Sequence, residues 1–225
     1  MPLPRFHAAI FDMDGLLLDS ERPIRDAWMQ ASRERGVVLG EREYLEVVGR
    51  NEADSRVRLQ AILGEACGYD EVRERAAVLI ADALGEAGYA VKAGVVALLD
   101  ALREREVPCV VASSTHVAEV RRRLHTASLA QHFQGFSGGD EVLRGKPHPD
   151  LFLLAAQRAG VEPGRCIVFE DSEHGARGAV AAGMSVVIVP DLKSPSEDAC
   201  AASLAVLASL HDAQRHVDDW FGPTH

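Results

Sequence analysis

The feature that most constrains the fold is a long interval without strand-like sequence near the N-terminus. The apolar run Ala8–Phe11 is typical of a buried strand, and the next such run begins only at Val107. Between them, apolar residues recur at helical spacing, at positions 24, 27, 28 and 31 and again at 72, 76, 79, 80 and 83. An ordinary connection between strands is far shorter. The sequence therefore predicts a helical domain over residues 20–88, inserted into a domain formed by residues 1–19 and 89–225.

The second domain shows an alternation of strand and helix patterns. Four more apolar runs are predicted to be strands: Val107–Ala112, a weaker run at Gly135–Ser137, Cys166–Phe169 and Ser185–Val189. Near-continuous apolar strands alternating with helices are typical of a parallel sheet covered on both faces. We therefore expect an α/β fold, a Rossmann-like doubly wound parallel sheet. The tail, Ser196–Trp220, is predicted to form one helix and a loose end.

Composition narrows the class of protein. The net charge of −10 over 225 residues, without a basic face, disfavours nucleic-acid binding. No apolar run reaches the roughly 18 residues of a membrane span. The N-terminus lacks the apolar core of a signal peptide, and the cysteines form no CxxC pair, so we expect a cytoplasmic protein with reduced, buried thiols. The sequence does not define the oligomeric state, and a monomer is compatible with it.

Two acidic pairs follow predicted strands. Asp12 and Asp14 come after the first strand, with Gly15 to turn the chain, and Glu170 and Asp171 end the strand that begins at Cys166. Each pair alone could be an exposed acidic turn. Together, at the carboxyl edge of one parallel sheet, they would crowd four carboxylates that cannot all stay ionised without compensation. A hard divalent cation such as Mg²⁺, which prefers oxygen ligands, would supply it.

Hydroxyl groups and one lysine complete the set. Ser113 and Ser114 follow the strand that begins at Val107, where they could cap a helix or bind an anion. Lys146 stands in a loop stiffened by two prolines, in a chain with only three lysines. A surface lysine is the alternative reading. A cation, hydroxyls and a lysine converging at one edge would suit a phosphoryl group as substrate.

The ordered motifs Asp-x-Asp-Gly, strand-Ser, Gly-Lys-Pro-x-Pro-Asp and Glu-Asp resemble those of the haloacid dehalogenase superfamily. The helical insert resembles the α-helical cap of the branch that holds small phosphatases and β-phosphoglucomutase. The resemblance implies that Asp12 is the nucleophile and that Asp14 is the acid and base, with its carbonyl toward Mg²⁺. It implies further that Asp171 binds Mg²⁺ and that Glu170 either binds the ion too or contacts one of its ligands.

The resemblance also assigns the substrate contacts. Ser113 and Ser114 would bind phosphoryl oxygens, and Lys146 would neutralise charge on the nucleophile and the transferring group. Arg50 falls in the segment Val47–Asn51, where this branch has its substrate-specificity loop, so it would contact the distal part of a small phosphorylated metabolite. A solvated surface arginine is the alternative for Arg50. The identity of the metabolite is left open.

Departures from the motifs of other branches favour hydrolysis. Dehalogenases lack the aspartate found here at Asp14, and phosphonatases need a cap lysine, whereas residues 21–88 contain none. The cap histidine of β-phosphoglucomutase falls on Ile24 here. We therefore predict Mg²⁺-dependent hydrolysis of a small phosphate monoester through an aspartyl-phosphate. The alternatives are a phosphosugar mutase and a catalytically silent protein that binds a phosphorylated metabolite.

Overall fold

The computed structural model describes residues 5–48, 52–64 and 67–222. Within them lies a six-stranded parallel sheet with the strand order β3-β2-β1-β4-β5-β6. The strands are β1 (Ala8–Phe11), β2 (Cys109–Ser113), β3 (Gly135–Gly138), β4 (Cys166–Glu170), β5 (Ser185–Ile188) and β6 (Ala205–Val206). This order places β1 in the middle of the sheet, which explains why every residue of its short apolar run is buried.

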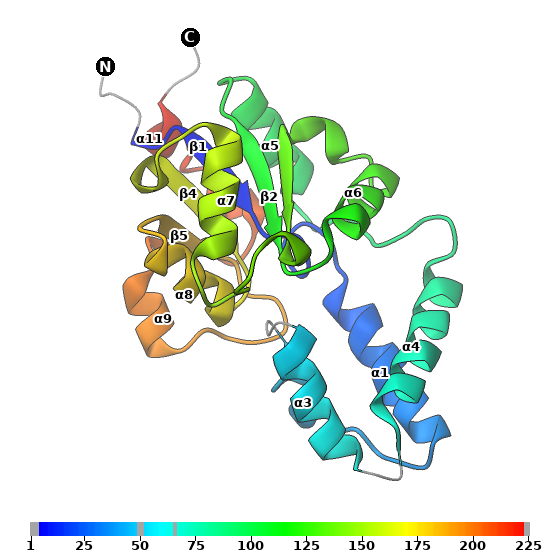
Figure 1. Ribbon diagram of the computed structural model, residues 1–225. Coiled ribbons are helices and arrows are strands. Elements are labelled where there is room, and N and C mark those ends of the chain that lie inside the picture. The colour runs from blue at the N-terminus through cyan, green and yellow to red at the C-terminus, as the bar shows by residue number, and fades with distance from the viewer. Residues whose placement is uncertain (1–4, 49–51, 65–66, 223–225) are drawn as a thin grey trace.

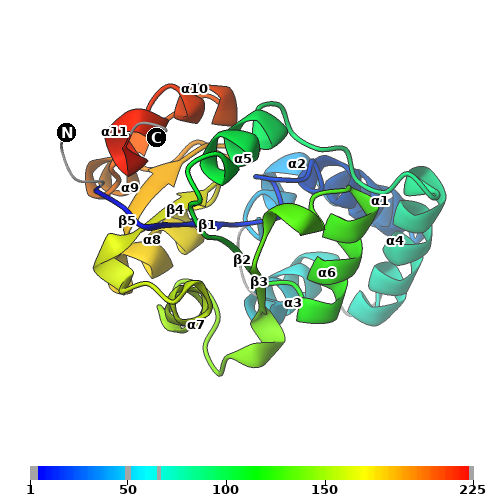
Figure 2. The ribbon, with the colours of Figure 1, turned by 90° about the horizontal axis from the view of Figure 1, so that it is seen from above.

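Helices cover both faces of the sheet, as Figure 2 shows. One face packs against α7 (Asp150–Ala159), α8 (Glu173–Ala181) and α9 (Glu197–Ala202). The other packs against α5 (Val95–Arg103), α6 (Val117–Thr126), α10 (Leu210–Gln214) and α11 (Val217–Phe221). Successive residues of β1 serve the two faces in turn, since Ala9 and Phe11 join one hydrophobic cluster and Ala8 and Ile10 the other. Short 3₁₀ turns, η1 (Ala130–His132), η2 (Gly139–Glu141) and η3 (Pro163–Arg165), complete the connections.

The predicted fold class is confirmed, and the tail is where the prediction was wrong. All five predicted strands are present, with ends that match the prediction or differ from it by one or two residues. The segment 196–220 holds α9, the sixth strand β6, α10 and most of α11 rather than one helix. Strand β6 is two residues long, so its alternation is too short to read from sequence. The thiols Cys67, Cys109 and Cys166 are free and buried as expected, whereas Cys200 is free but exposed.

The long interval after β1 forms a separate group of helices. It holds α1 (Glu21–Glu34), α2 (Glu41–Tyr44), α3 (Glu52–Leu63) and α4 (Tyr69–Leu84), which project beyond the end of the sheet where β1 ends (Figure 1). These helices bury their own hydrophobic cluster, in which the ring of Trp28 lies 5.4 Å from that of Tyr69. Among the described helices, none combines the length and apolar character that crossing a membrane would require.

The chain enters and leaves this helical segment at one place. Leu18 pairs with Val91 in an antiparallel bridge. On either side of it, the Asp19 N–H donates to the carbonyl of Ala90 at 2.8 Å, and the Lys92 N–H donates to the carbonyl of Leu17 at 3.0 Å. The outgoing and returning chains are therefore joined to each other at the edge of the sheet.

Candidate active site

Three neighbouring strands bring the predicted site residues together. In the parallel register, Phe11 of β1 lies between Val111 of β2 and Phe169 of β4. The residues that follow these positions therefore emerge at the same edge of the sheet. That edge carries Asp12 after β1, Ser113 at the end of β2 and Glu170 at the end of β4.

A buried group of carboxylates forms the centre of the site. Asp12, Glu170 and Asp171 each offer an oxygen, and these oxygens all lie within 4.8 Å of one another. Lys146, only 3% exposed, reaches into the group. Its Nζ donates hydrogen bonds to Asp12 Oδ1 and, at 2.5 Å, to Glu170 Oε1. The lysine is thus part of the centre, and the reading of Lys146 as a surface residue is wrong.

The charges in this group are only partly balanced. Burial, reinforced by the charges of Glu170 and Asp14, raises the pKa of Asp12 well above its usual value, against the opposing effect of Lys146. Burial and the charges of Glu170 and Asp12 raise the pKa of Asp171 in the same way. Burial alone would lower the pKa of Lys146, but the charges of Asp12 and Glu170 outweigh it and raise that pKa. The site still has an excess of negative charge.

The donor set fits a hard divalent cation. The available ligand atoms are carboxylate oxygens, which Mg²⁺ prefers, and an added positive charge would relieve the repulsion that raises the pKa of Asp12 and Asp171. The described residues can therefore hold a metal ion between Asp12, Asp171 and Glu170.

Glu170 is fixed by its neighbours on both oxygens. Oε1 accepts from Lys146, while Oε2 accepts from the backbone N–H of Ser172 at 2.8 Å and from its hydroxyl at 2.9 Å. Helix α8 approaches closely because position 175 is glycine: a Cβ there would lie 1.7 Å from Glu170 Oε1. The carboxylate is thus held by a strand, a loop and a helix at once.

The carboxylate of Asp14 has different partners. Its Oδ1 accepts from the Ser20 hydroxyl and from Arg123 Nη1, both at 2.8 Å. Its Oδ2 accepts from Thr115 Oγ1 at 2.9 Å and from Ser113 Oγ at 3.4 Å. The carboxylate therefore points toward α1 and α6. Any metal contact of Asp14 would have to come from its main chain, as the sequence interpretation proposed.

A cavity of about 190 Å³ joins these groups. Predicted site residues that line it are Asp12, Asp14, Ser113, Ser114, Lys146 and Asp171. Glu170 does not line the cavity but contacts Lys146, which does. Arg50 lies outside the described residues, so the structure does not test its assignment to the distal part of a substrate.

Sequence reasoning missed Arg123, Glu21, Ser20 and Thr115, of which Arg123, Glu21 and Thr115 line the cavity. Arg123 is the last of three consecutive arginines. The only available signal was its place next to Leu124, which with Val120 marks the buried side of α6. Ser20 and Glu21 stand where the chain leaves the sheet for α1, and nothing in the sequence shows that this connection folds back over Asp14.

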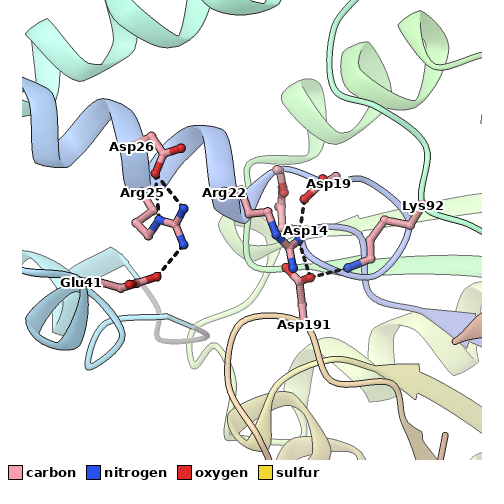
Figure 3. A network of polar contacts seen from close by, with 9 residues as sticks. Asp14, Asp19, Arg22, Arg25, Asp26, Glu41, Lys92 and Asp191 are labelled. Carbon is pink, nitrogen blue, oxygen red and sulfur yellow. Dashed lines mark hydrogen bonds and ion pairs between the residues drawn. The ribbon is translucent and has the colours of Figure 1, made fainter. Parts of the chain in front are cut away.

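Beside the site, the buried carboxylate of Asp191 holds the two connections between the sheet and the helical segment (Figure 3). Asp191, whose side chain is 1% exposed, follows β5. Its Oδ1 accepts from Arg22 Nη1 at 2.7 Å and from Lys92 Nζ at 2.5 Å. Arg22 belongs to the outgoing chain and Lys92 to the returning one, so a single aspartate holds both connections.

Comparisons with known proteins agree with this arrangement. A family model described as haloacid dehalogenase-like hydrolase matches residues 6–183. A probable pseudouridine-5'-phosphatase of Drosophila melanogaster is 35% identical over 213 residues, covering 90% of this chain and 89% of that protein. Hexitol phosphatase A of Escherichia coli is 32% identical over 181 residues, covering 80% and 81%.

Solved structures show the same fold. A hydrolase of the same family from Deinococcus radiodurans, with bound phosphate and sodium, superposes with a TM-score of 0.76 at 27% identity over 96% of this chain and 97% of that one. A β-phosphoglucomutase from Clostridium difficile superposes with a TM-score of 0.79 at 19% identity over 96% and 97%. By its sequence, its fold and its acidic site, the chain belongs to the family of haloacid dehalogenase-like hydrolases.

Proposed function

We propose that the protein hydrolyses a small phosphate monoester with Mg²⁺ as cofactor and Asp12 as nucleophile. The observation that carries the proposal is the buried contact of Lys146 with Asp12 and Glu170, next to Asp171, at the floor of an oxygen-lined cavity. The family is a hydrolase family, and its two relatives named above are phosphatases. The substrate would be a small phosphorylated metabolite, and a cytoplasmic setting stays a prediction.

The residues divide the reaction into two displacements. The Asp12 carboxylate attacks phosphorus and the alcohol leaves, taking a proton from Asp14; this forms an aspartyl-phosphate. Asp14 then accepts a proton from water, which attacks phosphorus, releases phosphate and restores Asp12. Lys146 offsets the negative charge on Asp12 and the transferring group, and Ser113 and Ser114 hold phosphoryl oxygens.

Bound Mg²⁺ would neutralise phosphoryl charge beside Asp12 and Asp171. Glu170 completes the group of three carboxylates around that position, and its oxygens also accept hydrogen bonds from Lys146 and Ser172. It holds the lysine and the β4 terminus in place.

We propose that residues 20–88 act as a cap over a core formed by residues 1–19 and 89–225. This division rests on the separate hydrophobic cluster of α1, α3 and α4 and on the paired connections at Leu18 and Val91. Glu21 and Ile24, at the start of α1, line the cavity together with core residues, so the cap would shield the reacting groups from water.

The wall of the cavity favours water over a sugar hydroxyl as the acceptor. Ile24 lines it where a mutase of this branch has a histidine, and among the described lining residues there is no histidine, and Lys146 is the only lysine. A silent binding protein is disfavoured because Asp12, Asp14, Lys146 and Asp171 all face one cavity.

The test is turnover of p-nitrophenyl phosphate and acetyl phosphate by the purified protein. We expect activity with Mg²⁺, none with EDTA, and recovery when Mg²⁺ is restored. Asp12→Asn should lower kcat by roughly 10⁴-fold or more, the scale observed when a covalent nucleophile is removed, and should abolish phosphoenzyme. Asp26→Asn, an exposed change on α1, is the matched control and should leave the rate unchanged. Full activity in EDTA, or an active Asp12→Asn protein, would overturn the proposal.

A further inference from the structure

A second and larger cavity borders the catalytic one. It has a volume of about 660 Å³ and lies between α1, α4 and α6. Ile24 and Arg123 line both cavities, so the two meet at these side chains. The larger cavity is of the size that holds small organic ligands, whereas the catalytic cavity of about 190 Å³ suits a phosphoryl group.

The position of Asp14 relates this second cavity to the reaction. In the proposed function, Asp14 gives a proton to the leaving oxygen, so the leaving group must lie on the Asp14 side of the phosphoryl group. Asp14 is hydrogen-bonded to Arg123 at 2.8 Å, and Arg123 lines the larger cavity. A leaving group that extends past Asp14 therefore meets the space between α1, α4 and α6.

One side of this cavity is apolar. From α4 it receives Ala77, Ile80, Ala81 and Leu84, whose spacing places them on one face of the helix. Ile24 and Trp28 of α1 also line the cavity. The alanines are exposed and Ile80 and Leu84 are half-buried, so these side chains offer unoccupied apolar surface to a ligand.

The arginines of this wall are already paired. Glu119 accepts from Arg122 Nη2 at 2.6 Å and from Arg123 Nε at 2.8 Å. Arg73 Nε lies 3.8 Å from Asp70 Oδ1. Each arginine in the described lining therefore has a carboxylate beside it, and Glu86 adds a further negative charge, so the lining opposes a second anionic group. The neutral polar side chains of the lining are those of Trp28, Tyr89 and Thr126. This lining suits a ligand that is uncharged and carries few polar groups.

We propose that the cavity between α1, α4 and α6 is a leaving-group pocket for phosphate esters of an uncharged alcohol that carries an apolar ring. The inference rests on the proposed phosphatase activity and names its substrate class. On the side formed by α4 and Ile24, a polyhydroxylated leaving group would lose hydrogen bonds to water and regain few, which costs free energy. An apolar ring would gain from burial against α4 and Ile24.

The first test compares alkyl esters of similar intrinsic reactivity in the wild-type protein. With Mg²⁺, kcat/KM for 2-phenylethyl phosphate should exceed that for ethyl phosphate and for glycerol 3-phosphate by about tenfold or more. If no phosphate ester is hydrolysed, the proposed function itself fails. If ethyl phosphate and 2-phenylethyl phosphate are hydrolysed equally well, the function stands and the leaving-group pocket is wrong.

The second test fills the pocket. Ala77→Phe places a ring in it, and Ala83→Phe is the matched control, because Ala83 is an exposed alanine of the same helix that does not line the pocket. Ala77→Phe should lower kcat/KM for 2-phenylethyl phosphate by about tenfold, mainly through KM, and change ethyl phosphate less than about twofold. Ala83→Phe should change neither. Equal losses for both esters in Ala77→Phe, or an unchanged ratio, would overturn the inference.

Discussion

Glu21 is a carboxyl group that reduces stability at neutral pH while it lines the site. Burial, together with the charges of Asp14 and Asp191, raises its pKa from 4.5 to about 7, against the opposing charges of Arg123 and Lys92. The folded state therefore binds a proton more tightly than the unfolded chain does. The free energy of unfolding should fall as pH rises from about 4.5 to 7 and stay lower above that range.

Glu21→Gln should remove this fall in the free energy of unfolding. In the metal-free protein with EDTA, the variant should match wild type below pH 4.5 and exceed its free energy of unfolding above pH 7. We expect a gain on the order of 1–2 kcal/mol, less than the full pKa shift implies, because water screens the half-buried carboxylate. Urea unfolding at pH 4 and pH 8 measures it. A variant less stable than wild type at pH 8 would show that Glu21 makes a favourable contact.

At this scale, the sequence reveals residues whose position alone implies chemistry. The place of Asp12 in the site was predictable because it follows a strand, and that of Lys146 because lysine is scarce in this chain and its loop is stiff. The place of Arg123 in the site was not predictable, because nothing distinguishes one of three consecutive arginines until the buried side of α6 is known. The hydrogen bonds to Asp14 come from residues far apart in the chain, so only the folded arrangement reveals them.

Among the elements, α8 depends most directly on one residue. Gly175 lets its first turn lie against Glu170, and a methyl group there would overlap Oε1, the atom that accepts from Lys146. Gly175→Ala should shift α8 or Glu170, so we expect kcat to fall by about tenfold or more and stability by roughly 1–3 kcal/mol. Phosphatase assays and thermal unfolding measure the two effects.

Gly164→Ala is the matched control, because a Cβ at 164 would approach only the Gly183 carbonyl oxygen, at 3.9 Å. It should leave both kcat and stability near wild type. A fully active and stable Gly175→Ala protein would mean that α8 does not constrain Glu170.

The strands and the long helical interval could be predicted because each carries several residues of one periodicity. Strand β6 and the short helices of the tail could not, since two to six residues are too few to define a period. Their positions are set by contacts: β6 exists because Ala205 and Val206 pair with Val187 and Ile188 of β5. Such pairing is a property of the tertiary structure and not of the local sequence.

For the whole molecule, Asp191 links the sheet to the two connections of the helical segment. Asp191→Ala would leave Lys92 and Arg22 without their buried partner, and we expect a loss of roughly 2–4 kcal/mol in the free energy of unfolding. Amide hydrogen exchange should also become faster at residues 17–22 and 89–92. Asp26→Ala, which removes an exposed ion pair with Arg25, should change stability by less than about 0.5 kcal/mol. Equal stability of the two variants would show that Asp191 does not hold these connections.

The bridge between Leu18 and Val91 has a consequence for how this molecule can change over time. The chain leaves the sheet for the helical segment and returns from it through two connections that lie side by side, so the connections set no length for the segment between them. Because the entropic cost of closing a loop grows only with the logarithm of its length, insertions and deletions there leave the sheet almost undisturbed. The edge of the sheet that carries Asp12 and the side of the larger cavity that α4 forms can therefore change in sequence and length separately from each other.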